Sequence, residues 1–150
     1  MGRILGLDYG SKTVGVAVTD PLRLTAGPVD TLCRKEENKL RRTLAAIEAY
    51  VRQYEVDRIV LGFPLNMDGS MSERAEKTLL FRDMLVKRTG LPVILQNEQL
   101  TTVEADEVLR EMGVPRAERK NYIDRIAAAV ILKDYLGSER KRSDVGTDCV

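Results

Sequence analysis

Three acidic residues stand where the sequence otherwise predicts buried structure. Asp8 ends the apolar run "ILGL", Glu98 directly follows the apolar segment "PVILQ", and Asp124 begins a helix whose next turns are apolar. A buried carboxylate is costly unless it has a partner. Taken singly, each has an ordinary explanation: Asp8 opens a turn, Glu98 precedes a helix, and Asp124 has arginine neighbours in the sequence.

The three acids together indicate a chemistry that none of them indicates alone. Two carboxylates ~4 Å apart repel by roughly 4 kcal/mol at an effective dielectric of about 20, so their convergence is sensible when cations lie among them. Carboxylate oxygens suit Mg²⁺ or Mn²⁺, and such ions promote phosphodiester cleavage. For Asp8, the residues themselves leave three interpretations open: a turn, a phosphate cradle formed with Gly10 and Gly15, and a metal ligand.

The composition excludes several other kinds of site. The 150 residues contain no histidine, so a Ser-His-Asp site, a Cys-His site or a His-containing zinc site cannot be built within the chain. Cys33 and Cys149 form no motif, and a disulfide framework is not expected. No apolar run approaches the ~20 residues of a membrane span, and we expect a cytoplasmic protein.

Positive charge is unevenly distributed although the net charge is only +1. Residues 34–42, "RKEENKLRR", hold five basic and two acidic residues, and residues 116–125, "RAERKNYIDR", hold four and two. Clusters of this kind commonly form a solvated face. They also bind phosphates locally without changing the overall charge balance.

The elements that must position these residues form a single α/β domain over residues 1–136, followed by a flexible tail over 137–150. We expect a mixed five-stranded sheet, made of an antiparallel hairpin, an edge strand and then parallel strands, with helices on both faces. Ligand sites collect beyond the carboxyl ends of such strands, where Glu98 is expected. The expected strands are 4–8, 14–18, one within 25–34 that Pro28 places at an edge or a bulge, 57–64 and 92–96; the expected helices are 36–54, 70–89, 102–112 and 121–136.

Four blocks of the sequence carry a resemblance to a known family. "LGLDYGSKTVGVAVTD", "IVLGFPLNMDGS" with "RAEK", "NEQLTT" and "DRIAAAVIL" resemble, in order and spacing, the YqgF or RuvX-like proteins of the ribonuclease H-like superfamily, which also contains the RuvC resolvases. The resemblance covers residues 3–136. It implies a ribonuclease H-like fold and a Mg²⁺- or Mn²⁺-dependent nuclease, with the catalytic and metal-binding acids at Asp8, Glu98 and Asp124. In bacteria the family is assigned to maturing the 5′ end of pre-16S ribosomal RNA.

The chain departs from the family pattern beside Glu98. The family usually has Asp-Glu-Arg-Leu where this chain has Asn97-Glu98-Gln99-Leu100, so an arginine able to hold phosphate or orient Glu98 is missing. Three other functions are weighed against an RNA nuclease. They are a Holliday junction resolvase acting on four-way DNA junctions, a non-catalytic RNA-binding or ribosome assembly factor, and an actin-like or sugar-kinase-like ATPase, whose first hairpin has a similar Asp-x-Gly motif.

Nucleic-acid contacts are expected from basic residues around the metal site. Arg74, with Lys77 as a further candidate, lies in the polar segment 64–77, and the alternative is that Arg74 only pairs with acids on its own helix. With few aromatic residues and a net charge of +1, we expect a short footprint on pre-rRNA, with help from a ribosomal particle, by a monomer or weak homodimer. The expected phosphate-binding residues are Lys12, Arg74, Arg119 and Lys120.

Overall fold

A five-stranded mixed sheet forms the centre of the protein in a computed structural model, which describes residues 2–64, 68–97, 107 and 109–148, the last stretch without the side chains of 119–121 and 140–148. The strand order is β3-β2-β1-β4-β5. The pairs β1–β2 and β2–β3 are antiparallel, whereas β1–β4 and β4–β5 are parallel. The predicted mixed sheet is confirmed. The strands are β1 (Arg3–Tyr9), β2 (Thr13–Thr19), β3 (Ala26–Cys33), β4 (Val56–Phe63) and β5 (Val93–Asn97).

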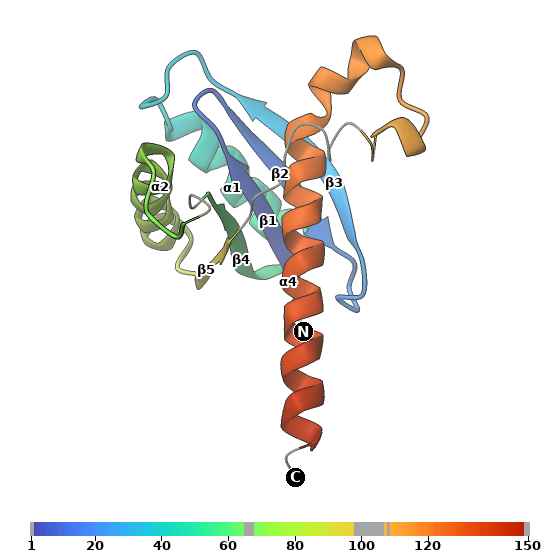
Figure 1. The fold of residues 1–150 in the computed structure, drawn as a ribbon. Coiled ribbons are helices and arrows are strands. Elements are labelled where there is room, and N and C mark those ends of the chain that lie inside the picture. The colour runs from blue at the N-terminus through green and yellow to red at the C-terminus, as the bar shows by residue number, and fades with distance from the viewer. Residues whose placement is uncertain (1, 65–67, 98–106, 108, 149–150) are drawn as a thin grey trace.

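Helices cover both faces of this sheet (Figure 1). The helices α1 (Arg41–Gln53) and α2 (Glu73–Thr89) lie on one face, and α4 (Ile123–Asp148) crosses the other. A short 3₁₀ helix, η1 (Arg116–Asn121), immediately precedes α4. The first half of α4 packs on the strands and the second half extends past them (Figure 1). No helix in the described part of the chain is long and apolar enough to cross a membrane.

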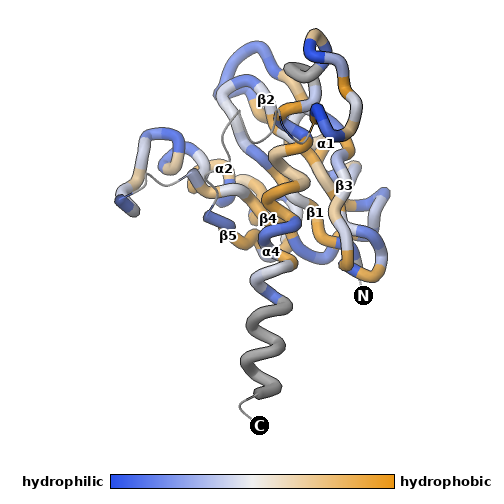
Figure 2. Tube along the Cα trace, turned by 45° about the vertical axis from the view of Figure 1, so that its right-hand side comes forward, coloured by the Kyte–Doolittle hydropathy of each residue, from blue (hydrophilic) through white to orange (hydrophobic). Residues whose placement is uncertain are grey.

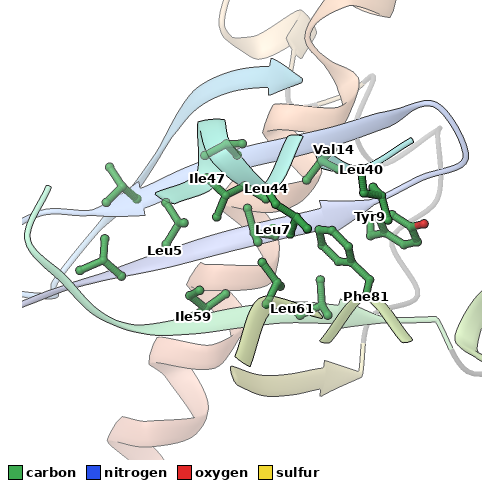
Figure 3. Packing of buried hydrophobic residues seen from close by; sticks show 14 residues of the cluster. Leu5, Leu7, Tyr9, Val14, Leu40, Leu44, Ile47, Ile59, Leu61 and Phe81 are labelled. Atoms are coloured by element: carbon green, nitrogen blue, oxygen red, sulfur yellow. The ribbon is translucent and has the colours of Figure 1, made fainter. Parts of the chain in front are cut away.

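Alternation along the strands divides the core between the two faces. Leu5 and Leu7 of β1 point toward α1 and α2, where they meet Leu44, Ile47 and other buried residues (Figure 3). Ile4 and Gly6, which alternate with these leucines along β1, lie on the side of α4, whose apolar part packs against the strands (Figure 2). Asp8 therefore belongs to the α4 face of the sheet, as the sixth residue of β1.

Glycines let α4 approach the strands closely. A Cβ atom at Gly6 of β1 would lie 2.4 Å from Leu132 Cγ, and one at Gly62 of β4 would lie 2.5 Å from Ile131 Cδ1. Real side chains do not tolerate such contacts. These glycines thus allow α4 to pack closely on the sheet, and this brings the first turn of α4 next to the end of β1.

The starts of two helices differ from the predicted starts. Helix α1 begins at Arg41 rather than at 36, because the preceding residues form a turn in which Lys39 N donates to Glu36 O. Helix α2 is capped by Ser72, whose Oγ accepts a hydrogen bond from Ala75 N, and not by Ser70, which hydrogen-bonds Asp68. The apolar pattern predicted the buried part of each helix more accurately than the residue at which the helix begins.

Helix α4 ends at Asp148 and not at 136, which corrects the predicted end of this helix. Apolar periodicity stops at Leu136 because the helix leaves the sheet there. In the part beyond the sheet, the residues of high helix propensity are Glu139, Arg140, Lys141 and Arg142, which need no core. Flexibility of residues 137–150 remains a prediction. The predicted helix 102–112 falls largely outside the described residues; its predicted stop, Gly113, has φ +80° and donates to Arg110 O.

Candidate active site

Asp8 lies on the wall of a cavity of about 220 Å³ at the carboxyl end of β1. It is half-buried, between the fully buried Leu7 and the nearly buried Tyr9. The cavity is bounded by strand ends, by the start of α2 and by α4. Its lining residues are Asp8, Tyr9, Gly62, Phe63, Pro64, Arg74, Ala127 and Ile131.

Asp124 approaches the same place from the first turn of α4. In the β1–β2 ladder Asp8 pairs with Gly15, and a Cβ atom at Gly15 would lie only 1.9 Å from the carbonyl oxygen of Asp124. The first turn of α4 therefore rests directly on the backbone beside Asp8. Ala128 and Ile131, on the same side of the helix as Asp124, are buried against the sheet, as the spacing predicted.

The electrostatics of Asp8 reflect this neighbour. Burial, and then the charge of Asp124, raise the pKa of Asp8 to about 6, while the guanidinium of Arg74 acts in the opposite direction. A carboxylate beside a second acid is stabilised when a cation binds between them. The pair therefore provides hard oxygen ligands whose charge a divalent cation would neutralise.

The third predicted acid, Glu98, lies outside the described residues. The residue before it, Asn97, is the last of β5 and pairs with Phe63 at the end of β4. Because β1, β4 and β5 are parallel, β5 ends on the same side of the sheet as β1, where Asp8 lies. Within residues 2–64, 68–97, 107 and 109–148, no group of three acidic or cysteine side chains forms a metal site, so Glu98 as third ligand remains a prediction.

Arg74 is brought to the cavity by the start of α2. Ser72, the cap of α2, donates through Oγ to Pro64 O at 3.1 Å, and this bond ties the helix start to the end of β4. The Arg74 guanidinium then lies 4.9 Å from the centre of the Tyr9 ring. Its ion-pair partner is Glu37, from the loop between β3 and α1. The alternative in which Arg74 pairs with acids on its own helix is wrong.

Three residues next to this site were not predicted from the sequence, namely Tyr9, Arg34 and Glu37. Tyr9 stacks on Phe81 with ring centres 4.3 Å apart, and the Arg34 guanidinium lies 5.0 Å from the Tyr9 ring centre. Arg34 and Glu37 belong to the basic cluster 34–42, whose composition indicates only a charged patch. That composition does not indicate that Glu37 forms an ion pair with Arg74 of α2.

The other predicted phosphate-binding residues belong to the β1–β2 turn and to η1. Lys12 is exposed in the β1–β2 turn, where its carbonyl accepts from Arg34 N at 2.8 Å. Arg119 and Lys120 belong to η1, next to the start of α4, and their side chains are outside the described part of the structure. Arg125, the arginine that follows Asp124 in the sequence, donates through Nε to Thr31 Oγ1 of β3 at 3.2 Å.

Known proteins are similar to this chain over nearly its whole length. The family model described as "RuvX: Holliday junction resolvase" matches residues 2–138. A Lachnospira eligens protein named "Putative pre-16S rRNA nuclease" is 55% identical over 139 residues, covering 93% of this chain and 99% of the relative. A Halothermothrix orenii protein of the same name is 45% identical over 139 residues, with coverage of 93% and 97%.

Solved structures share the fold at low sequence identity. Thermus thermophilus RuvC in complex with a Holliday junction substrate gives a TM-score of 0.54 at 15% identity, covering 91% of this chain and 97% of that one. The fowlpox virus Holliday junction resolvase gives 0.52 at 16% identity, with coverage of 91% and 98%. The predicted ribonuclease H-like fold is therefore confirmed.

Proposed function

The chain belongs to the RuvX family, and on this basis we propose that it is a nuclease that cleaves phosphodiester bonds of RNA and matures the 5′ end of pre-16S ribosomal RNA. The observation that carries the proposal is that Asp8 lines a cavity together with Arg74 and feels the charge of Asp124, from the first turn of α4. Acids that repel each other beside a phosphate-binding cation suit metal-assisted phosphodiester cleavage. The choice of pre-16S rRNA as the substrate rests on the names of the two relatives.

Asp8 and Asp124, with Glu98 as the third acid, are the residues that would hold Mg²⁺ or Mn²⁺. The raised pKa of Asp8 fits this role, because burial and then the charge of Asp124 disfavour the carboxylate, and a bound cation would favour it. When bound, the metal supplies a Lewis acid that activates water and stabilises the leaving oxygen. The protein's own part is to hold the acids rigidly, through the strand β1 on one side and the glycine-seated helix α4 on the other.

Phosphate contacts come from cations around the cavity. Arg74 presents a planar guanidinium, which matches phosphate oxygens in a bidentate manner. Lys12, Arg119 and Lys120 extend the contact to flanking phosphates. With no Trp and only two Phe in the chain, stacking on many bases is not available, so we propose a short footprint. A ribosomal particle would then help a monomer or weak homodimer in the cytoplasm to find its cut.

A four-way DNA junction is the second candidate substrate. The description of the matching family model, and a fold shared with two Holliday junction resolvases, favour it. Against it stands the net charge of +1, because binding to long duplexes grows with the number of phosphates neutralised. Asn97 and Gln99, in place of a charged pair beside Glu98, reduce the grip on either substrate and keep a non-catalytic assembly factor among the alternatives.

The cellular test is the 5′ end of 16S ribosomal RNA in cells depleted of this protein. We expect precursors with extended 5′ ends to accumulate, and a plasmid copy of the wild type to remove them. The Asp8→Asn protein, expressed to the same level, should leave the extended ends in place. Mature 5′ ends in depleted cells, or full rescue by Asp8→Asn, would contradict the proposed function.

A further inference from the structure

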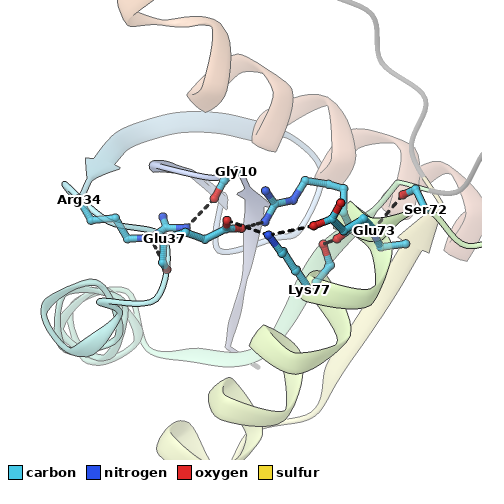
Figure 4. Close-up of polar contacts among 9 residues, drawn as sticks. Gly10, Arg34, Glu37, Ser72, Glu73 and Lys77 are labelled. Atoms are coloured by element: carbon cyan, nitrogen blue, oxygen red, sulfur yellow. Dashed lines mark hydrogen bonds and ion pairs between the residues drawn. The ribbon is translucent and has the colours of Figure 1, made fainter.

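Glu37 is held by two cations of α2 and by an arginine of its own loop. Its two carboxylate oxygens accept hydrogen bonds from Arg74 Nη2 and from Lys77 Nζ, the latter at 3.1 Å (Figure 4). Its backbone carbonyl accepts from Arg34 Nε at 3.1 Å. The hydrogen bonds from Arg74 and Lys77 lower the pKa of Glu37, so the carboxylate is ionised at neutral pH.

This cluster, defined by Glu37, Arg34, Arg74 and Lys77, lies between two hollows. Arg74 lines the cavity that contains Asp8, whereas Glu37 and Lys77 line a second hollow of about 310 Å³. Tyr9 lines both. A nucleic-acid strand that runs from Asp8 into the second hollow must pass these cations.

The cluster has more donors than Glu37 can satisfy. Arg74 Nε and Arg34 Nη1 are buried and have no hydrogen-bond partner in the described part of the chain. A buried donor left unpaired costs about 1–3 kcal/mol. Both guanidinium groups lie on the Tyr9 ring. The carboxylate of Glu37 offers two oxygens, and these accept from Arg74 and Lys77. The arrangement is that of an anion site filled by the protein's own acid.

We propose that Glu37 occupies the place of a substrate phosphate, and that nucleic acid binds by exchanging this carboxylate for a phosphate on Arg74 and Lys77. The inference rests on the proposed function, since it assumes a nucleic-acid strand in the cavity of Asp8. Glu37 then lowers the affinity for polyanions in general. A substrate that also contacts the acidic site through metal ions overcomes this competition, and other nucleic acids do not.

A purely structural role for Glu37 makes a different prediction. If Glu37 only fastens the loop 34–40 to α2, its replacement lowers stability and leaves nucleic-acid affinity unchanged or weaker. Glu73 provides the matched control for charge. It pairs with the same Lys77 at 3.4 Å, and its side chain is 83% exposed, whereas Arg74 pairs with Glu37.

The test compares Glu37→Gln and Glu73→Gln with the wild type in fluorescence anisotropy titrations. The probes are a short labelled single-stranded RNA and a labelled four-way DNA junction, with Ca²⁺ to neutralise the acidic site. Glu37→Gln should bind about five-fold more tightly, as expected when a partly exposed ion pair no longer competes. Its dependence of log affinity on log salt should steepen by about one, because freed cations release counterions on binding. Glu73→Gln should change affinity less than about two-fold.

The outcomes separate the inference from the function. Binding of the junction but not the RNA contradicts the proposed function, and the two variants still decide the role of Glu37 on the junction. Equal affinities for Glu37→Gln and Glu73→Gln, or no detectable binding by Glu37→Gln to either probe, would overturn the inference. So would persistence of the gain in Glu37→Gln when Arg74→Ala is added, because the gain requires a freed Arg74.

Discussion

At the scale of the residue, Asp8 is held where its charge is unfavourable. Its pKa is raised to about 6 by burial and by Asp124, and Arg74 only partly offsets this. Residues whose charge the fold destabilises are typical of sites that bind or react. The proposed site would need no histidine, since paired acids and a metal ion suffice for phosphodiester cleavage.

Removing either acid should abolish cleavage without unfolding the protein. In Asp8→Asn and Asp124→Asn, amide oxygen replaces a charged ligand of the same size, and we expect activity to fall by at least about 100-fold, the usual scale for a lost catalytic group. Cleavage of a labelled RNA in Mn²⁺ measures this. Asp134→Asn, an exposed position on the same helix α4, is the control and should keep full activity. Full activity in Asp124→Asn would remove that residue from the site.

In the metal-free protein, the contribution of Asp8 to stability should fall as the pH rises from about 4 to 6. The pKa of Asp8 is about 6 in the folded protein and 3.8 ordinarily, so in this window the folded state binds more protons than the unfolded chain. Asp8→Asn removes this contribution. At pH 7 in EDTA, the variant should be more stable than the wild type by about 2–3 kcal/mol, and at pH 4 the difference should shrink.

Urea unfolding of both proteins at the two pH values measures this difference. A constant difference between pH 4 and pH 7 would show that Asp8 does not titrate as the structure indicates. A wild type more stable than Asp8→Asn at pH 7 would show that the carboxylate is satisfied without a metal.

At the scale of the element, the strands were the best-predicted part of the fold. Continuous apolar runs bounded by turn residues identified β1, β2, β4 and β5, and Pro28 correctly placed β3 at the edge of the sheet, where the register also shifts. Helix starts were harder: the capping-box spacing of Ser70 and Glu73 predicted Ser70 as the cap of α2, whereas Ser72, which lies beside Pro64 O, caps it.

The candidate site was predictable only in part, for a physical reason. The acids on β1 and α4 follow from burial patterns along one element at a time. The cluster around Glu37 depends on contacts across 37 positions to Arg74 and 40 positions to Lys77, and no local pattern encodes such distances. Likewise, the role of Gly15 depends on how closely α4 approaches β2, which the hairpin sequence does not reveal.

The contact between Gly15 and the first turn of α4 makes a prediction at this scale. Gly15→Ala places a Cβ atom 1.9 Å from the carbonyl oxygen of Asp124, so α4 must move away from β2. We expect destabilisation of about 2 kcal/mol or more, typical of overpacking, and loss of cleavage because Asp124 leaves Asp8. Gly27→Ala, in β3, is the control, since no described atom lies within 4 Å of the position that its Cβ atom would take.

Thermal unfolding and RNA cleavage report the two effects separately. A Gly15→Ala protein that is as stable and as active as Gly27→Ala would show that the close seat of α4 does not position the site. Loss of stability with full activity at low temperature would show that the helix moves without carrying Asp124 away.

At the scale of the whole molecule, the candidate site combines an acid, Asp8, and a base, Arg74, on the wall of the same cavity. The net charge of +1 fits local recognition of a few phosphates. The sheet, with α4 on one face and α1 and α2 on the other, is shared with resolvases that act on DNA junctions, so the fold alone does not choose the substrate.

The most direct measurement of the central claim is cleavage of two substrates side by side by the purified protein in Mn²⁺. One is a short RNA spanning the 5′ boundary of the 16S precursor, and the other is a synthetic four-way DNA junction, each labelled and present at equal concentration. The proposed function predicts metal-dependent cleavage of the RNA, absent from Asp8→Asn, while the junction stays intact. Symmetric nicking of the junction with the RNA left uncut would contradict it.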